Sequence, residues 1–522
     1  MGVLETIPAA LARAAALWPD MEALVDGDER ITFGEYAARA DRVSRALVAA
    51  GVGPGDRVAL WMPNTWETAV VAMGVYGAGA VVVPVNTRFK SGEMAHVVRR
   101  AGARLLVVRG DFLGIDYLQM IDEAGLWPEL AATVLVGPGA DPRTVAFADF
   151  LAAGDGVPTA LVEERRAALG PRSLSDVLFT SGTTGSPKGV MLCHGGSVGA
   201  YLAYNRSLGV RPGDRMLGIA PFFHCFGLKA GVLSGVLGGA TLVPQAVFDV
   251  RRTAELIRDE RLTVLAAPPP VWLGLLNDPG IDRSTLRSLR VAMVGAARFS
   301  AQNFVRIRDE LGITHFAPGY GLTEAHAAVT RCHWDHDFET VSTTSGYPIP
   351  GVELRIVGDD GGDLPAGAEG EILVRGYQVM LGYLDDEAAT AAAIDPDGWL
   401  HTGDVGRIDG RGRLVVTDRK KDMFIVGGFN AYPAEIERIL LEHPAIADVA
   451  VIGVPDERMG EVGRAFVMVR DGYRLTADEV VEWARGLMAN YKVPRRVEVV
   501  DDLPRNASGK ALKHVLRERA FG

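Results

Sequence analysis

Apolar and polar positions alternate with two different periods along the first part of the chain. Thr32-x-x-Glu35 is a capping-box pattern, and it predicts an amphipathic helix that runs to about Ala50. Short buried runs and helical patterns then alternate, which is typical of parallel sheets covered by helices. Strands are predicted over 56–62, 80–85 and 104–108, and helices over 66–79 and 92–101.

A second alternation of the same kind lies between residues 240 and 317. It predicts strands over 240–244, 263–267, 290–295 and 314–317, and helices over 251–261 and 302–311. The pattern then changes to short strands separated by glycine-rich turns, over 352–357, 371–375 and 413–417. We therefore expect an α/β fold with two stacked α/β lobes and a small β subdomain.

The run Asp418-Arg419-Lys420-Lys421-Asp422 separates this region from about 100 further residues, enough for a small mobile α+β domain. We expect an N-terminal domain over 1–418, with its β subdomain at about 345–418. Residues 419–421 are the expected hinge and residues 422–522 the expected C-terminal domain. The length of 522 residues agrees with about three such units.

Composition narrows the class of protein. A hydrophobic share of 48% and a charged share of 23% fit a globular chain, and the net charge of −11 argues against a duplex-binding protein. No apolar stretch reaches the ~18 residues of a membrane span, and the N-terminus lacks the pattern of a secretory signal. We expect a cytoplasmic protein that binds no nucleic acid. Its three cysteines are far apart, so we expect free thiols.

The strongest local pattern is Leu178-Phe-Thr-Ser-Gly-Thr-Thr-Gly-Ser-Pro-Lys-Gly189, in which a predicted strand enters a loop rich in glycine and hydroxyl groups. It is not a Walker loop, because its lysine does not precede Ser or Thr at a helix start. Such a loop still suits a polyphosphate, since glycines let the backbone approach an anion while hydroxyls and a lysine donate to it. The residues concerned are Thr180, Ser181, Gly182, Thr183, Thr184, Gly185 and Lys188. The alternative interpretation is a flexible surface hairpin.

This segment resembles the phosphate loop of the adenylate-forming superfamily, which includes acyl-CoA synthetases, luciferases and peptide-synthetase adenylation domains. Further similar segments follow in the family's order over essentially the whole chain. They are Tyr320-Gly-Leu-Thr-Glu324, Thr402-Gly-Asp404, Asp418-Arg419 with Lys421, Gly427-Gly-Phe-Asn-Ala-Tyr-Pro433 and Pro504-Arg-Asn-Ala-Ser-Gly-Lys510.

The resemblance implies a role for each of these segments. For ATP and AMP it implies adenine and α-phosphate contacts by Tyr320, Gly321 and Thr323, ribose contacts by Asp404 and Arg419, and Mg²⁺ binding by Glu324. It further implies a hinge at Lys421, a CoA tunnel at Gly427, Gly428 and Phe429, and Lys510 as the lysine that contacts the carboxylate. The expected catalytic residues are Lys510, Thr184, Glu324 and His224.

Three of these residues also have simpler interpretations. Glu324 could be a dipole partner at a helix start, and Lys510 could be a solvated lysine in a basic tail. Lys421 could likewise be one of several solvated charges. The chain contains only 8 lysines against 46 arginines, however, and a retained lysine favours a role that needs a compact ammonium.

The expected acyl pocket follows the family's positions. It comprises Phe222, Phe223, His224, Val271, Trp272, Gly295, Ala296, Ala297 and Gly319. His224 has no metal-spaced partner, and the family resemblance implies a gate and pocket wall at its position, so we do not assign it to proton transfer. Two segments depart from the family pattern, namely Gly295-Ala-Ala-Arg298 and Met191-Leu-Cys-His-Gly-Gly196. The first affects pocket shape, and neither removes a catalytic group.

The implied activity is that of an ATP-dependent acid:CoA ligase that uses Mg²⁺. The segments 221–231 and 341–346 are most similar to actinobacterial ligases for steroid-derived ring propanoates, so we expect a bulky alicyclic or terpenoid acid. The alternatives are a medium-chain fatty acid, or transfer of the acyl group to another thiol such as that of a carrier protein. A nucleotide sensor without catalysis and a luciferase-like oxidation are weaker hypotheses, and a homodimer is compatible with the sequence.

Overall fold

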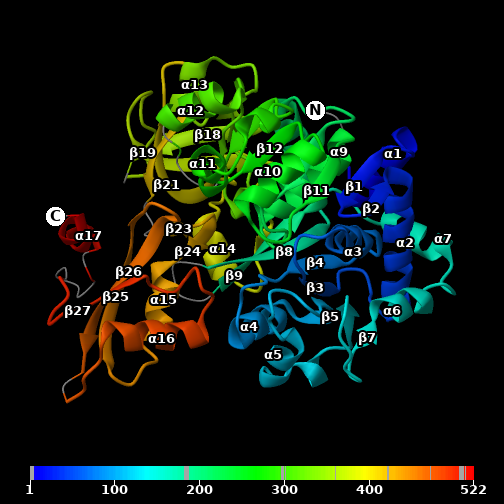
Figure 1. Ribbon diagram of the computed structural model, residues 1–522, viewed down its shortest axis with the longest axis horizontal. Coiled ribbons are helices and arrows are strands. Elements are labelled where there is room, and N and C mark those ends of the chain that lie inside the picture. The colour runs from blue at the N-terminus through cyan, green and yellow to red at the C-terminus, as the bar shows by residue number, and fades with distance from the viewer. Residues whose placement is uncertain are drawn as a thin grey trace.

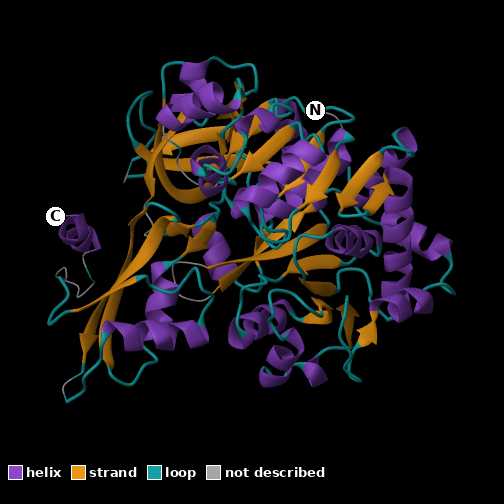
Figure 2. Ribbon diagram, in the orientation of Figure 1, coloured by secondary structure: helices purple, strands orange, loops and turns teal. Residues whose placement is uncertain are grey.

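The structure is a computed structural model that describes residues 5–181, 187–295, 299, 301–358, 360–419, 423–470, 472–504, 511 and 513–521. Two large sheets with helices on their faces make up most of the chain, and the C-terminal elements form a separate body, orange to red in Figure 1. Strands and helices alternate through both large sheets (Figure 2). The α/β class predicted from the sequence is confirmed.

The first large sheet has eight strands in the order β20-β9-β8-β4-β3-β5-β6-β7. Strands β4, β3, β5, β6 and β7 are parallel, whereas β8 and β9 form an antiparallel hairpin around the predicted phosphate loop. The strands are β3 (Arg57–Trp61), β4 (Val81–Pro84), β5 (Ala103–Arg109), β6 (Ala132–Val136), β7 (Val145–Ala146), β8 (Leu174–Ser181), β9 (Pro187–Cys193) and β20 (Gly382–Tyr383).

The second large sheet has seven strands in the order β14-β13-β12-β10-β11-β1-β2. Its predicted strands pair in parallel, and the first two strands of the chain complete one edge because β1 pairs with β11. The strands are β1 (Glu22–Asp26), β2 (Glu29–Thr32), β10 (Arg215–Gly218), β11 (Thr241–Pro244), β12 (Val264–Ala267), β13 (Val291–Val294) and β14 (His315–Phe316).

Helices cover these sheets at the predicted positions. Helix α2 begins at the predicted capping box, in which Glu35 N donates to Thr32 Oγ1 at 3.2 Å and Thr32 N donates to Glu35 Oε2 at 2.9 Å. The α-helices of this region are α1 (Ile7–Leu17), α2 (Phe33–Ala49), α3 (Trp66–Gly77), α4 (Ser91–Ala101), α5 (Tyr117–Glu123), α6 (Phe147–Ala153), α7 (Thr159–Ala167), α8 (His194–Leu208), α9 (Ser234–Gly238), α10 (Val250–Asp259), α11 (Pro269–Asn277), α12 (Ala301–Leu311), α13 (Phe338–Thr343) and α14 (Glu387–Ala393). Short 3₁₀ turns span Trp127–Glu129, Arg283–Leu286 and Thr323–Ala325, and a π-helix spans Phe226–Leu233.

Two smaller sheets follow the second α/β series. One is β15 (Gly319–Tyr320), β16 (Thr330–Arg331) and β17 (Tyr347–Pro348), and the other is β18 (Val352–Val357), β19 (Gly370–Gly376), β21 (Leu400–Ile408) and β22 (Leu414–Arg419). The latter contains the strands expected of the β subdomain. The intervening β20 leaves this region and pairs with β9 of the first large sheet, so the two parts are interlocked.

The C-terminal elements build their own sheet and core. Strands β23 (Phe424–Val426), β24 (Phe429–Ala431), β25 (Ile446–Asp456), β26 (Gly460–Val469) and β27 (Arg496–Val499) pack with α15 (Pro433–Leu440), α16 (Ala477–Leu487) and α17 (Lys513–Phe521). Their buried apolar side chains, from Phe424 to Leu516, form one cluster. A hydrophobic cluster of its own is what a separately folded domain requires.

A buried ion pair joins the phosphate-loop hairpin to the π-helix. Lys229 Nζ lies 2.6 Å from Asp176 Oδ2, and neither side chain is more than 1% exposed. Tyr76 and Ser175 also donate to the Asp176 carboxylate, at 2.5 Å and 2.6 Å. Because a buried charge is costly without such partners, this network fixes β8 relative to the segment that follows His224.

The structure also bears on the expected state of the cysteines and on the expectation of no membrane span. All three cysteines are buried free thiols, as predicted. Within the described ranges, no helix is long and apolar enough to cross a bilayer.

Candidate functional site

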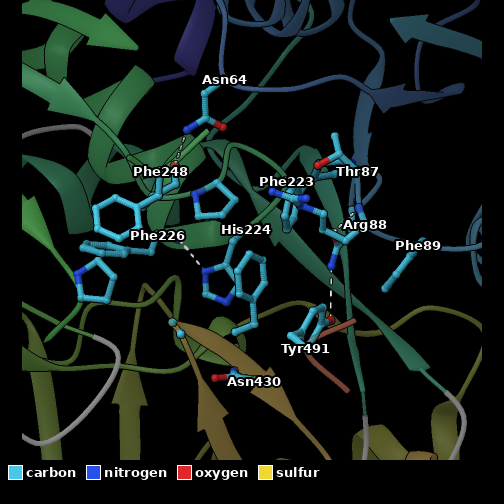
Figure 3. Close-up of a pocket in the computed structure, with 18 of the residues that line it drawn as sticks. Asn64, Thr87, Arg88, Phe89, Phe223, His224, Phe226, Phe248, Asn430 and Tyr491 are labelled. Carbon is cyan, nitrogen blue, oxygen red and sulfur yellow. Dashed lines mark hydrogen bonds between the residues drawn. The ribbon is translucent and has the colours of Figure 1, made fainter. Parts of the chain in front are cut away.

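A cavity of about 190 Å³ lies where both large sheets meet the C-terminal elements (Figure 3). Its walls are the loops that follow β4 and β10, the two ends of the phosphate-loop hairpin, and the turn between β23 and β24. Because loops at the carboxyl ends of parallel strands diverge, ligands commonly bind there in α/β sheets. The wall residues include Asn86, Thr87, Arg88, Phe89, Thr180, Pro187, Phe223, His224, Phe226, Val271, Gly427, Gly428, Phe429 and Tyr491.

His224 lies on the cavity wall immediately before the π-helix. Burial lowers the pKa of its imidazole to about 4, so the ring is neutral at pH 7. Phe226 N donates to His224 Nδ1 at 3.2 Å, which places the ring proton on Nε2. A neutral donor of fixed orientation suits a pocket wall better than a source of positive charge.

The phosphate-loop hairpin carries the first group of predicted nucleotide residues. Thr180 lines the cavity, and Lys188 Nζ lies 5.0 Å from the ring centroid of Tyr383 on the neighbouring strand β20. The Tyr383 hydroxyl donates to Glu324 Oε1 at 3.0 Å, so Glu324 lies beside the same hairpin. A lysine and a carboxylate are thus brought together from segments more than 130 residues apart in the chain.

Glu324 is a suitable ligand for Mg²⁺. Tyr383 orients one of its carboxylate oxygens, and Mg²⁺ in nucleotide sites is usually held by one or two carboxylates together with phosphate oxygens. Among the described residues, no group of three or more His, Cys, Asp or Glu side chains could hold a metal ion by itself. The oriented Glu324 carboxylate fits a metal that also binds phosphate oxygens.

The second group lies at the start of the small sheets. Tyr320 of β15 donates to Asp404 Oδ2 of β21 at 2.6 Å, and Asp404 is only 8% exposed. Asp404 pairs with Arg419 in the β21–β22 register. The predicted adenine and ribose residues are therefore adjacent, as the family resemblance implies.

The C-terminal elements close the cavity with their glycine turn. Gly428 has a φ of +90°, and a Cβ at this position would lie 3.2 Å from Pro268 Cγ, so glycine permits both the turn and its close approach. Next to it, the Phe429 ring stacks on Phe223 at 6.1 Å and on Tyr491 at 4.7 Å between centroids. This stack joins the predicted tunnel to the predicted acyl-pocket segment.

A buried lysine also holds the C-terminal elements against helix α4. Lys492 Nζ contacts Glu435 Oε1 at 2.7 Å within the C-terminal elements and Glu93 Oε1 at 2.8 Å on α4, and Lys492 is 1% exposed. Burial by itself would lower the pKa of this ammonium, but Tyr491 and the two carboxylates raise it above its usual value. The Glu93 contact crosses between the two bodies, so rotation of the C-terminal body would break it.

Several predicted residues do not line this cavity. Phe222 and Trp272 are buried in the hydrophobic core, where the Trp272 indole donates to Met293 O at 3.3 Å. A Cβ at Gly319 would lie 2.4 Å from Thr330 O and 2.7 Å from Arg331 Cδ. The side chain of Arg331, its cross-strand neighbour, therefore fills the space toward which a Cβ at Gly319 would point. Gly319 does not line this cavity, and its place in the acyl pocket stays a prediction.

Other predicted residues cannot be placed. Gly182, Thr183, Thr184, Gly185, Ala296, Ala297, Lys421 and Lys510 lie outside the described residues, as do the side chains of Ser181 and Arg419. Gly295 is described, and a Cβ there would meet Met293 and Phe226, so it lies near the cavity wall without lining it.

Among the residues of the site that were not predicted from the sequence are Asn64, Arg88, Tyr383 and Lys492. Asn64 fixes the loop after β10, since its Nδ2 donates to Gly218 O and Ala220 O at 2.9 Å and its Oδ1 accepts from Phe222 N at 2.8 Å. No pattern along the chain marks Asn64, Arg88 or Tyr383, because their partners are distant in sequence. The scarcity of lysine could have singled out Lys492.

The chain is similar to known proteins over nearly its whole length. Residues 11–384 match the family model described as AMP-binding enzyme, and residues 435–510 match the AMP-binding enzyme C-terminal domain. Two relatives are named as 7a-methyl-1,5-dioxo-octahydro-1H-inden-4-yl propanoyl:CoA ligases. The Rhodococcus jostii protein is 48% identical over 98% of each chain, and the Mycobacterium tuberculosis protein is 47% identical over 99% of each.

Solved structures of similar proteins cover the same length. The amide bond synthetase McbA from Marinactinospora thermotolerans has a TM-score of 0.85 and 28% identity, over 98% of this chain and 99% of its own. The o-succinylbenzoate CoA synthetase MenE from Bacillus subtilis has a TM-score of 0.82 and 28% identity, over 98% of each chain.

Proposed function

The chain belongs to the AMP-binding enzyme family, and we propose that it activates a propanoate carried on a fused, ketone-bearing ring. It is an AMP-forming acid:CoA ligase. The observation that carries the choice of acid is the 48% and 47% identity, along nearly the full chain, to two ligases named for such a ring propanoate. Feruloyl-CoA synthase of Amycolatopsis, at 36%, is less similar.

The reaction has two steps. The acid's carboxylate attacks the α-phosphate of ATP to give acyl-AMP and pyrophosphate, and the CoA thiol then attacks the acyl carbon to give the thioester and AMP. A carboxylate is a poor electrophile. The first step therefore joins it to AMP, which is a good leaving group when the thiol attacks. Because two anions approach each other in that step, donors and cations must offset their charges.

We assign the first step to the hairpin and the small sheets. Thr180 and Lys188 would bind the phosphates, Tyr320 and Asp404 the nucleoside, and Lys510 the attacking carboxylate. Glu324 would hold Mg²⁺, which when bound neutralises phosphate charge. The neutral His224 would form the wall of the acyl pocket on the side from which the thiol arrives.

The second step is assigned to the orientation that the C-terminal body has in this structure. Its glycine turn lines the cavity that leads to His224, and the Phe223, Phe429 and Tyr491 rings form one side of the path. A pantetheine arm is slender and partly apolar, which suits such a channel. Rotation about Lys421 would replace this arrangement by one that brings Lys510 to the carboxylate.

Product analysis tests the proposed reaction type. With ATP, CoA and a ring propanoate, we expect AMP, pyrophosphate and acyl-CoA in equal amounts, identified by mass. Formation of ADP would contradict the chemistry. Pyrophosphate release with acyl-AMP but no acyl-CoA would instead favour a different thiol acceptor, such as a carrier protein.

A further inference from the structure

A buried arginine lies behind the nucleotide site without a matching anion. Arg331 of β16 is 6% exposed, and its only hydrogen bond within the described part of the chain is from Nη2 to Ala327 O at 3.4 Å. Its Nε and Nη1 have no hydrogen-bond partner among the residues that the structure describes. Burying a guanidinium in this state is unfavourable, because its lost hydration is not replaced.

Unpaired hydroxyls on α8 share this environment. The Arg331 guanidinium lies 4.5 Å from the ring centroid of Tyr204, whose buried hydroxyl has no hydrogen-bond partner in the described part of the chain. Ser197 lies two turns before Tyr204 on the same face of α8. Its hydroxyl is likewise buried without a hydrogen-bond partner among the described residues. Tyr201, between them on the same face, packs against Tyr204 at 5.4 Å between ring centroids.

The segments around Arg331 are those that form the site. Gly319 is its cross-strand partner, and a Cβ at Gly319 would lie 3.0 Å from Arg331 Nη1. The next residue, Tyr320, donates to Asp404. Ala327, which accepts from Arg331, follows Glu324 by three residues. Arg331 therefore lies one strand away from Tyr320 and contacts the loop that follows Glu324, two of the residues expected to bind the nucleotide and its metal.

We propose that Arg331, supported by Tyr204, recognises a hydrogen-bond-accepting oxygen on the ring of the acid, namely a ring ketone. This inference rests on the proposed function, because it assumes an acid long enough to reach from the α-phosphate into the interior. Nε and Nη1 lie on different edges of the planar guanidinium, and each offers an N–H donor that a ketone oxygen can accept. A purely hydrocarbon acid would leave the same donors unpaired.

A role of Arg331 in recognising the ketone can be distinguished by measurement from a purely structural role. A site that holds buried donors rejects an analogue that lacks the acceptor, whereas a structural residue affects all acids alike. The matched pair of probes is the diketo ring propanoate and the same ring acid with both carbonyls replaced by CH₂. The readout is the ratio of their kcat/KM values at saturating ATP and CoA.

We expect the wild-type enzyme to favour the diketo acid and Arg331→Met to reduce that ratio by roughly 10- to 100-fold. Tyr204→Phe keeps the ring and should reduce the ratio less. Arg413→Met is the matched control, because Arg413 is also 6% exposed but is paired with Asp409 at 2.7 Å, and it should leave the ratio unchanged.

Equal losses for both acids, or an unchanged ratio, in Arg331→Met would overturn the proposal. If that variant does not fold, Arg331→Lys retains a buried cation but lacks the two unpaired guanidinium donors, and an unchanged ratio there would overturn the proposal equally. A wild-type enzyme that forms acyl-CoA from neither ring acid would contradict the proposed function. A wild type that uses both acids equally well would contradict only this inference.

Discussion

Lys510→Ala is expected to slow adenylate formation by at least about 10²-fold, while CoA transfer to supplied acyl-AMP changes little. An ammonium that both orients and neutralises the attacking carboxylate contributes to the barrier in two ways, and their joint loss is worth about 3 kcal/mol or more. Its place after Asn506-Ala-Ser-Gly509, a turn-forming run, would let its long stem reach a bound ligand.

The two half-reactions are measured separately. Pyrophosphate release in single turnover reports the first step, and thioester formation from synthetic acyl-AMP reports the second. Lys513→Ala is the matched control, since Lys513 is three residues away and pairs with Glu437 at 2.7 Å. A similar loss in both half-reactions of Lys510→Ala would contradict its assigned role.

The opposite selectivity is expected for Lys492→Met. This change leaves Glu93 and Glu435 without their shared buried cation, and loss of one partner of a buried ion pair costs about 3–5 kcal/mol. Because the Glu93 contact joins the C-terminal body to α4 in this structure, its loss would make this orientation less populated. CoA transfer should slow at least about 10-fold, with adenylation changed by less than about twofold.

Two further variants separate the docking contact from the internal one. Glu93→Gln removes only the contact between the bodies and should show the same selectivity with a smaller effect. Glu129→Gln breaks an exposed ion pair with Arg99 near α4 and should affect neither step. If Lys492→Met slowed adenylation as much as CoA transfer, the docking role would be wrong and general destabilisation would explain the loss.

The sequence was most informative where the cause of structure is local. The Thr32 capping box and the alternating buried runs predicted helix α2 and the parallel strands β3, β4 and β5 within a few residues. These features depend on hydrogen bonds and periodicity within one segment. The phosphate-loop string was equally clear because its residues lie next to one another in the chain.

Long-range pairing is what the sequence did not predict. Nothing near Glu22 indicates that β1 completes a sheet with β11, more than 200 residues later, or that β20 pairs with β9. The same applies to Phe222 and Trp272, whose apolar side chains fit a pocket wall and a core equally well until the packing is known. Arg331 fills the space beside Gly319 only because strands β15 and β16 place them opposite each other.

The most direct test is the ratio of kcat/KM for the diketo ring propanoate to that for octanoate, measured as acyl-CoA formed at saturating ATP and CoA. A site selective for the ring acid should give a ratio of roughly 10 or more. The ring would fill the acyl pocket, and its ketones would accept hydrogen bonds from buried donors. A ratio below one would contradict the ring-acid assignment and favour a medium-chain fatty acid, while the ligase chemistry would stand.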